Sequence, residues 1–324
     1  MTRASEAAAA LSPEEFYAEF TRRNAGVVTE RQQRALSTAT VLVAGCGSVG
    51  GAAVEPLTRL GVRDFVLAEP DTFELNNLNR QQATFRDLGR NKAEVAAERV
   101  IAINPHASVR VHAEGVTQEN VFELTAFCDL IVDGVDVTTG PGWQAKHALH
   151  RSASQRRLPL ITGWDMAGVQ YVQCYDYRHV PEPFNGLVTE DDLRQCGVWE
   201  LIFKAIPVQL IPPDMLTEVA PNLTNQDYSV PQVIYAAVMF GAITSHMAAR
   251  LLAGEEVRDE VHLDLHEQVR PATRRRLNRA EAESLLFALR QTSARGLGSP
   301  DPGKDEQTER NAGGNGEGMR RATR

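Results

Sequence analysis

The residues whose types and spacing could do chemistry begin at a glycine-rich loop. Gly45, Gly47 and Gly50 have G-x-G-x-x-G spacing and follow directly after a short apolar run, residues 41–44. Glycines in this pattern allow a tight turn, the approach of a phosphate to the backbone and close packing of a helix on a strand, while the helix N-terminus offers free N–H groups. The pattern predicts a nucleotide-binding strand, loop and helix, with Ser48 in the loop that approaches the phosphates.

A second apolar run, residues 65–68, ends at Glu69, which lies 19 residues after Gly50. An acid at this distance accepts hydrogen bonds from ribose hydroxyls in nucleotide-binding α/β folds. Enzymes that use NAD and enzymes that use ATP share these features, so they indicate only a nucleotide. The loop that follows contains an acid, two amides and a guanidinium group, which a hydride-transfer enzyme has no evident use for. These residues are Asp71, Asn77, Arg80 and Gln81.

A lysine completes the set of polar residues. Lys92 opens a predicted helix over residues 93–103, where its charge opposes the helix dipole unless an anion lies nearby. The ordered glycines, Glu69, Asp71, polar loop and lysine resemble the ThiF/MoeB/ubiquitin-activating-enzyme superfamily, whose members adenylate a carboxylate. The resemblance extends over about residues 22–177.

The resemblance implies ATP and Mg²⁺ as cofactors and assigns roles to the polar loop. Arg80 and Lys92 would stabilise the charge that develops on the leaving pyrophosphate. Asn77 and Gln81 would orient phosphates, and Asp71 would complete the nucleotide site. We expect Arg80 and Lys92 to be solvent-accessible in a cleft.

Two further residues take roles from the resemblance. Asp136 is the second acid of a D-x-x-D pattern after a buried-strand run and would hold Mg²⁺ through oxygen ligands and retained waters. Val137 stands where the family usually has asparagine, and Asp133, the first acid, has a simpler role as a loop cap. Arg23, or else the adjacent Arg22, would reach the ATP phosphates of the partner in a homodimer.

The fold class expected is α/β, a Rossmann-like and mainly parallel sheet with helices on both faces and an antiparallel extension. Residues 1–35 would form a helical arm and residues 36–290 the adenylation domain, within which residues 180–230 would form a crossover segment that meets the acceptor. Residues 291–324 lack large apolar side chains and are predicted to be a disordered tail. Alternation in residues 171–177 predicts an antiparallel strand with one exposed face.

Composition excludes several classes of function. The net charge of −8 argues against a general nucleic-acid binder. The four cysteines form no C-x-x-C pair, so neither structural zinc nor a disulfide framework is indicated, and a reduced cytoplasm is the simplest location. The N-terminus is a poor secretory signal. The most apolar long stretch contains an uninterrupted part, residues 233–243, that is too short to cross about 30 Å of hydrocarbon, so we expect a buried helix and no membrane contact.

The predicted reaction is ATP-dependent adenylation of a carboxylate with release of pyrophosphate. The acceptor could be a carrier-protein C-terminus, a peptide or a small acid, and the proline-rich crossover without zinc cysteines favours peptide or specialised-metabolite tailoring. An NAD-dependent oxidoreductase fits the glycine loop and Glu69 equally, and a non-catalytic partner of an active subunit is a second alternative. Cys196 lies where thioester-forming relatives carry a cysteine, but it lacks their following threonine, so we expect no catalytic thiol there.

Overall fold

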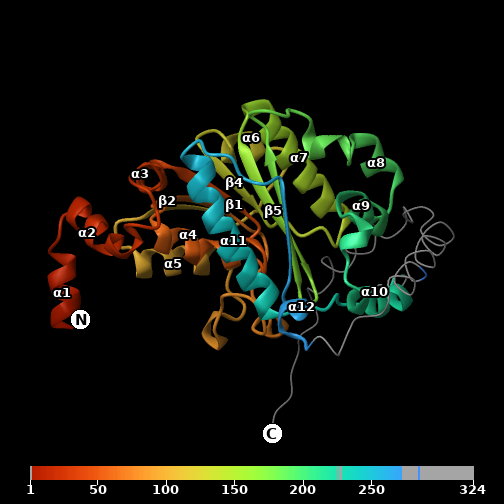
Figure 1. Cartoon of the computed structure of the whole chain (residues 1–324), viewed down its shortest axis with the longest axis horizontal. Coiled ribbons are helices and arrows are strands. Elements are labelled where there is room, and N and C mark those ends of the chain that lie inside the picture. The colour runs from red at the N-terminus through yellow and green to blue at the C-terminus, as the bar shows by residue number, and fades with distance from the viewer. Residues whose placement is uncertain (1, 224, 226–227, 272–283, 285–324) are drawn as a thin grey trace, which may run out of the picture.

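The fold is built on a seven-stranded sheet with strand order β3-β2-β1-β4-β5-β6-β7 (Figure 1). The computed structural model describes residues 2–223, 225, 228–271 and 284. The strands are β1 (Thr40–Ala44), β2 (Asp64–Ala68), β3 (Ser108–His112), β4 (Leu130–Asp133), β5 (Pro159–Met166), β6 (Val169–Asp176) and β7 (Glu260–Asp264). Strands β3, β2, β1, β4 and β5 pair in parallel, whereas β6 and β7 add in antiparallel fashion. The predicted Rossmann-like class with an antiparallel extension is confirmed.

Helices cover both faces of this sheet. The helices are α1 (Arg3–Ala9), α2 (Pro13–Phe20), α3 (Glu30–Thr38), α4 (Gly50–Leu60), α5 (Lys92–Ile103), α6 (Val121–Leu124), α7 (Gly140–Arg156), α8 (Glu190–Gln195), α9 (Val198–Ala205), α10 (Pro213–Val219), α11 (Ile234–Leu252) and α12 (Leu265–Val269). Strand β1 alternates between two apolar clusters, as its period of two requires. Val41 and Val43 pack with α4, α5 and α11, whereas Leu42 and Ala44 pack with α6, α7, α9 and α10.

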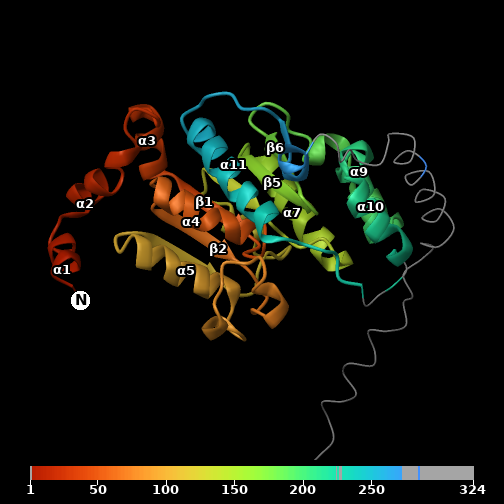
Figure 2. The ribbon, with the colours of Figure 1, turned by 60° about the horizontal axis from the view of Figure 1, so that its bottom comes forward.

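The N-terminal arm extends away from the sheet. Helices α1 and α2 lie at one end of the molecule, and α9 and α10 lie at the opposite end in both views (Figures 1 and 2). Ser12 caps α2, because its hydroxyl accepts the N–H of Glu15 while the Glu15 carboxylate accepts the N–H of Ser12. Helices α1 and α2 lie within the segment predicted as an arm, residues 1–35. The predicted tail, residues 291–324, lies outside the described residues.

The prediction of one exposed face on β6 is wrong. Seven of its eight residues are buried. Tyr171 and Tyr175 pack into the cluster that contains α7 and α9, whereas Val172 and Cys174 pack into the cluster that contains α11. Because layers cover both sides of this strand, its polar and aromatic alternation does not mark a solvated face. Cys174 is a buried packing residue, as expected.

The long apolar helix α11 lies against the sheet and α4. Among the described residues it is the one helix that is long and apolar enough to cross a membrane by length and composition, a test that the core helix of a soluble protein also passes. Its buried residues include Phe240 and Met247, which contact the same cluster as β1. The expected helix is thus present, with half of its most apolar window buried.

A glycine sets the distance between α11 and α4, which gives a testable prediction. A Cβ added at Gly241 would lie 2.2 Å from the carbonyl oxygen of Ala52 on α4, so one of the two helices must shift. We expect Gly241→Ala to lower the free energy of unfolding by about 1–3 kcal/mol, the usual cost of overpacking. Urea denaturation measures this.

Gly140→Ala is the matched control. Gly140 also lies in a helix, and a Cβ there meets nothing within 4 Å. Gly140→Ala adds the same methyl group without a clash, so it shows the cost of the substitution when no helix has to shift. Equal stabilities for the two variants would contradict the prediction.

Candidate active site

A cleft of about 680 Å³ lies where the carboxyl ends of the parallel strands meet. It receives the loops after β1, β2 and β4 and the carboxyl end of β5 itself, and helix α9 forms one of its walls. Ligands of open α/β sheets bind at this edge, where the order of the strands reverses direction. The predicted residues that line the cleft are Gly47, Ser48, Glu69, Asp71, Asn77, Arg80, Gln81, Lys92 and Asp136. The fold therefore brings these distant positions together.

The glycine loop has the backbone geometry that the sequence predicted. Gly45 has φ +83°, and its N–H donates to the carbonyl oxygen of Ala68 at 2.8 Å. A Cβ on Gly45 would lie 2.2 Å from the carbonyl oxygen of Gly134, and one on Gly50 would lie 1.9 Å from that of Gly45. Gly47 instead faces open space, since its nearest neighbour would be Gln81 Nε2 at 3.8 Å. This opening suits the approach of a phosphate to the backbone.

Glu69 is buried beneath the glycine loop. Its Oε2 accepts the N–H of Cys46 at 2.7 Å, and its Oε1 accepts the N–H of Asp71 at 3.0 Å. Burial raises the pKa of this carboxyl above its usual value, although the backbone bonds and the charge of Lys92 oppose that shift. Glu69 thus ties the loop after β1 to the loop after β2 and still lines the cleft. Its contact with a ribose stays a prediction.

The loop after β2 carries polar atoms without partners in the described structure. Arg80 donates from Nη1 to the carbonyl oxygen of Asn76 and to Asn79 Oδ1, both at 2.9 Å, but its buried Nε has no partner. Gln81 is buried, and its Oε1 is also unpaired. Burial lowers the pKa of Arg80, although an arginine remains charged in proteins. Buried polar atoms are normally satisfied, so these atoms indicate a ligand or water that completes them.

Asn77 instead serves the turn that holds Arg80. Its side-chain oxygen accepts the N–H of Glu74 at 3.0 Å, and its own carbonyl oxygen accepts the N–H of Gln81 at 2.8 Å. The side-chain nitrogen donates to Asn76 Oδ1. The contacts of Asn77 are therefore with the protein backbone and a neighbouring side chain, and its predicted role in orienting phosphates stays a prediction.

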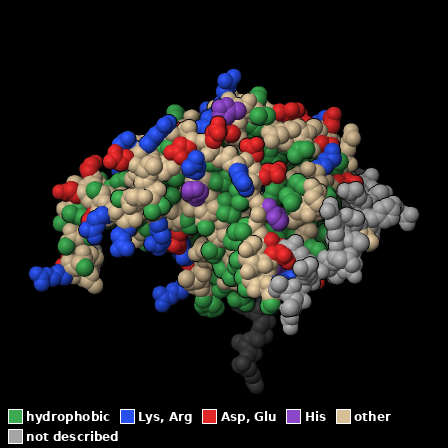
Figure 3. Space-filling model, viewed as in Figure 1, with side chains coloured by type: hydrophobic (Ala, Val, Ile, Leu, Met, Phe, Trp, Pro, Cys, Tyr) green, Lys and Arg blue, Asp and Glu red, His purple; other side chains and the backbone are tan. Residues whose placement is uncertain are grey.

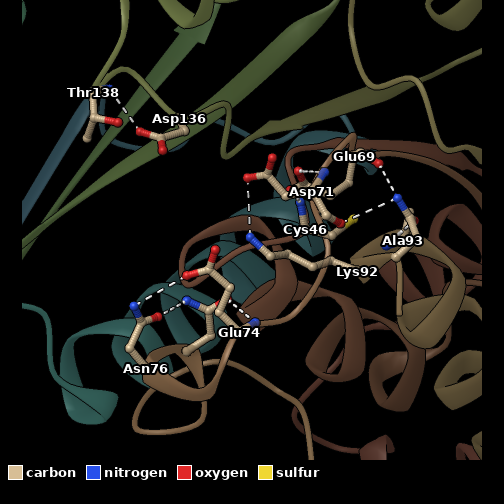
Figure 4. Close-up of polar contacts among 11 residues, drawn as sticks. Cys46, Glu69, Asp71, Glu74, Asn76, Lys92, Ala93, Asp136 and Thr138 are labelled. Carbon is tan, nitrogen blue, oxygen red and sulfur yellow. Dashed lines mark hydrogen bonds and ion pairs between the residues drawn. The ribbon is translucent and has the colours of Figure 1, made fainter. Parts of the chain in front are cut away.

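Lys92 is less exposed than expected. Its side chain is 9% exposed, and Nζ lies 3.4 Å from Asp71 Oδ2 (Figure 4). Asn91 caps α5 by accepting the N–H groups of Ala93 and Glu94, and its own amide donates to the carbonyl oxygen of Glu69. This cap fixes where the lysine emerges. Lys92 lines the cleft all the same, so its ammonium group is available at the wall rather than in open solvent.

Asp136 lies apart from the Lys92–Asp71 pair (Figure 4). It is exposed, and its Oδ1 accepts the N–H of Thr138 at 2.8 Å. Within the described residues, no group of three or more His, Cys, Asp or Glu side chains could hold a metal ion. Mg²⁺ commonly takes one or two carboxylates and fills its other positions with water and phosphate oxygens. Asp136 fits that mode of binding.

Arg23 is outside the cleft of its own chain. It is exposed in a short 3-10 segment, Arg22–Asn24, between the arm and α3, and the adjacent Arg22 pairs with Glu19 at 3.2 Å. The predicted finger would therefore have to act in a second copy of the chain. Nothing in the single chain tests that role.

Sequence reasoning missed a buried charged network behind the cleft. Asp133 caps its loop as expected, since Oδ1 accepts the N–H of Val135, but its Oδ2 lies 2.6 Å from Lys146 Nζ and 2.9 Å from His150 Nε2. All three side chains are essentially buried. The sequence does contain a signal for this network. Lys146 and His150 are four residues apart, so they share one face of a helix, and that helix follows a strand that ends at Asp133.

A second missed residue is Asp165 at the end of β5. Its Oδ2 accepts the hydroxyl of Ser48 at 2.9 Å. Gln170 donates to Oδ1 at 2.6 Å in the amide orientation that satisfies both of its ends. Burial raises the pKa of Asp165 to about 6, even though the Ser48 hydrogen bond and the charge of Arg80 act in the opposite direction. A buried carboxyl thus borders the phosphate loop.

Cys196 has no environment that would activate a thiol. Burial raises its pKa, and its main electrostatic neighbours are the cation Lys204 and the acids Asp192 and Glu200. A nucleophilic cysteine needs a lowered pKa. The geometry agrees with the expectation that Cys196 does not act as a nucleophile.

The raised pKa of Asp165 predicts a pH-dependent stability. Between about pH 4 and 6 the folded protein holds a proton that the unfolded chain has released, so the contribution of this residue to stability falls as pH rises through that window. Asparagine does not titrate. We expect Asp165→Asn to be more stable than wild type at pH 8 by up to roughly 3 kcal/mol and equal to it near pH 4.

Thermal unfolding of both proteins across this pH range measures the effect. Comparison at each pH removes the contribution of every other titrating group. Two stability profiles that run parallel from pH 4 to pH 8 would show that Asp165 is ionised throughout.

This chain resembles known proteins both in sequence and in fold. The family model described as "ThiF family" matches residues 21–252. The chain is 37% identical over 135 residues to the sulfur carrier protein adenylyltransferase of Thermus thermophilus, covering 41% of this chain and 48% of the relative. It is 33% identical over 135 residues to the tRNA threonylcarbamoyladenosine dehydratase of Escherichia coli, with the same two coverages. The chain thus spans about half the length of these curated relatives.

Solved structures share the fold at low identity. The crystal structure of PaaA has a TM-score of 0.59 and 18% identity, covering 79% of this chain and 72% of PaaA. The ATP complex of the E. coli tRNA dehydratase TcdA has a TM-score of 0.52 and 20% identity, covering 75% of this chain and 98% of that one. The family match covers more than two thirds of the chain and includes every cleft residue named above. This chain belongs to the ThiF family.

Proposed function

We propose that this protein binds ATP and Mg²⁺ and adenylates a carboxylate, forming an acyl-adenylate and releasing pyrophosphate. The observation that supports this most strongly is the pair of cations, Arg80 and Lys92, at one cleft with the open backbone position at Gly47. A solved structure of TcdA, which shares the fold, is a complex with ATP and supports nucleotide binding by this chain. Membership of the ThiF family disfavours the NAD-dependent alternative.

The chemistry requires positioning and charge stabilisation rather than a general base. A carboxylate is already ionised at neutral pH and can attack the α-phosphorus directly. Arg80 would donate to phosphate oxygens from its guanidinium group, and Lys92 would stabilise the leaving pyrophosphate at the cleft wall. Mg²⁺ held at Asp136 would neutralise phosphate charge when bound. Glu69 would bind the ribose, and Ser48 would lie beside the phosphates. Asn77 and Gln81 would orient the phosphates, and Asp71 would complete the nucleotide site.

The acceptor we favour is a peptide, with a carrier-protein C-terminus or a small acid as the other options. Helices α8, α9 and α10 occupy the predicted crossover, residues 180–230, and α9 lines the cleft. A solved structure of similar fold, MccB with MccA-N7isoASN, has a TM-score of 0.52. The net charge of −8 disfavours nucleic acid, and four free cysteines in the described residues suit the cytoplasm.

A homodimer with composite sites completes the proposal. Apolar side chains gather on the surface around α11 (Figure 3), where Ile234 is 44% and Val238 is 49% exposed. Leu75 and Phe85, in the loop that holds Arg80, are 70% and 76% exposed. Exposed apolar surface of this kind is typical of an interface. We propose that a second copy covers this surface and that its Arg23 acts in the other chain's cleft.

The first prediction of this proposal concerns the two cations. We expect Lys92→Ala and Arg80→Ala to lower ATP–pyrophosphate exchange by about 10²-fold or more, the usual cost of losing one donor to a transition-state charge. The assay uses purified protein with a panel of peptides and small acids. Arg34→Ala is the matched control, because its exposed pair with Glu30 is not among the residues that line the cleft.

Exchange at the wild-type rate in either cleft variant would remove the basis for the assignment. Absence of exchange with the whole panel in wild type would favour the remaining alternative, a non-catalytic partner of an active subunit. Circular dichroism of each variant checks that the fold is retained.

The second prediction concerns the composite site. Arg23→Ala and Lys92→Ala should each be inactive alone, but a mixture of the two proteins should recover up to about a quarter of the wild-type exchange rate, because mixed dimers contain one site with both groups intact. Sedimentation at the assay concentration measures the oligomeric state. A monomeric protein, or a mixture no more active than its parts, would contradict the composite site.

A further inference from the structure

The cleft has a second compartment beside the nucleotide residues. The two compartments belong to one continuous cavity, and strand β5 contributes to both, since Asp165 contacts Ser48 whereas Thr162 contacts Lys146. The second compartment has a lysine on its floor and apolar side chains around it. Its lining residues are Lys146, Trp164, Val198, Trp199, Ile202, Ile206 and Met215.

One N–H group of the Lys146 ammonium has no hydrogen-bond acceptor in this compartment among the described residues. An ammonium group offers three donors. One goes to Asp133 Oδ2 at 2.6 Å and another to Thr162 Oγ1 at 2.9 Å, and no third acceptor lies within hydrogen-bonding distance among the described residues. The side chain is 3% exposed and lines the cleft, so the remaining donor is desolvated. A buried donor of this kind calls for an acceptor.

The network behind Lys146 holds the lysine rigidly. His150 donates from Nε2 to Asp133, and its Nδ1 accepts the hydroxyl of Tyr177 at 2.6 Å, because the Tyr177 oxygen in turn accepts the N–H of Phe184. This assignment makes His150 neutral, in agreement with a pKa that burial lowers to about 4. Asp133 is therefore an anion whose two carboxylate oxygens both accept hydrogen bonds from protein groups.

The surroundings of Lys146 select among anions. Its Nζ lies 5.3 Å from the centroid of the Trp164 ring, and α9 supplies further apolar walls. A phosphate prefers several donors, which the glycine loop, Arg80 and Lys92 offer in the nucleotide part of the cleft. One donor within apolar walls instead suits a monoanion attached to a hydrophobic group.

We propose that Lys146 binds the carboxylate of the acceptor and that the α9 compartment holds an apolar side chain next to that carboxylate. The proposal rests on the adenylation function above and deepens it, because it names the acceptor class as an apolar carboxylate. Lys146 would then orient the attacking oxygen towards the nucleotide compartment.

Tryptophan fluorescence tests this without ATP, since Trp164 and Trp199 both line the compartment. The probes are N-acetylated tripeptides ending in leucine, phenylalanine or valine, each as the free acid and as the C-terminal amide. We expect at least one acid to bind wild type about tenfold or more tightly than its amide, as loss of a charged hydrogen bond implies. Equal binding of every acid and amide, including no binding of either, overturns the proposal.

Two variants assign the preference to this lysine. The double variant Lys146→Gln with Asp133→Asn removes both charges together, which avoids leaving a buried carboxylate unpaired, and it should bind acid and amide equally. Trp199→Ala is the matched control, which should weaken both forms and keep their ratio. If the double variant does not fold, Ile202→Asp replaces it, because a carboxylate in the wall should weaken acid binding selectively.

An acid preference that survives these charge changes would overturn the role of Lys146. ATP binding, measured in parallel by calorimetry, separates the two proposals. Wild type that shows the acid preference but binds no ATP would contradict the adenylation function, whereas wild type that binds ATP without an acid preference contradicts only the assignment of Lys146.

Discussion

The close contact between the loops after β1 and β4 is the constraint on which the cleft depends. A Cβ at Gly45 or at Gly134 would lie within 3 Å of the backbone of the opposite loop, so neither position tolerates a side chain without movement. Because β1 and β4 are neighbours and β2 lies on the other side of β1, this contact places three carboxyl-end loops around one space. The predicted nucleotide-binding residues after β2 and the acids at the end of β4 can line one cleft only because these loops are packed so closely.

Buried charge divides this space into two chemical environments. On one side, Asp165, Ser48 and Arg80 form a polar surface next to the glycine loop. On the other side, the Asp133–Lys146 pair lies below the apolar wall of α9. A buried ion pair adds little net stability, since desolvation offsets most of the attraction. A reason to keep such a pair at a cleft floor is that it fixes the position of one charged donor.

The local part of the site could be predicted from the sequence. The strand, the glycine loop and α4 follow one another directly in the chain, as do Asn91 and Lys92 at the start of α5, so spacing alone reveals them. Asp165 could not be found this way, because it meets its partner Ser48 only through the sheet order β1-β4-β5. Lys146 follows Asp133 on the next helix along the chain, so its pairing could have been inferred from the sequence. The exposed face expected on β6 was wrong for a related reason, since α9 and α11 cover that strand from segments far away in sequence.

The central claim is the adenylation of a carboxylate, and the products formed from ATP test it most directly. Purified protein is incubated with α-labelled ATP, Mg²⁺ and the acceptor panel, with hydroxylamine present to capture an activated acyl group. The account predicts AMP and pyrophosphate together with an acyl hydroxamate, in equal amounts. Formation of ADP and phosphate, or of AMP without any hydroxamate from an acceptor that stimulates turnover, would contradict it.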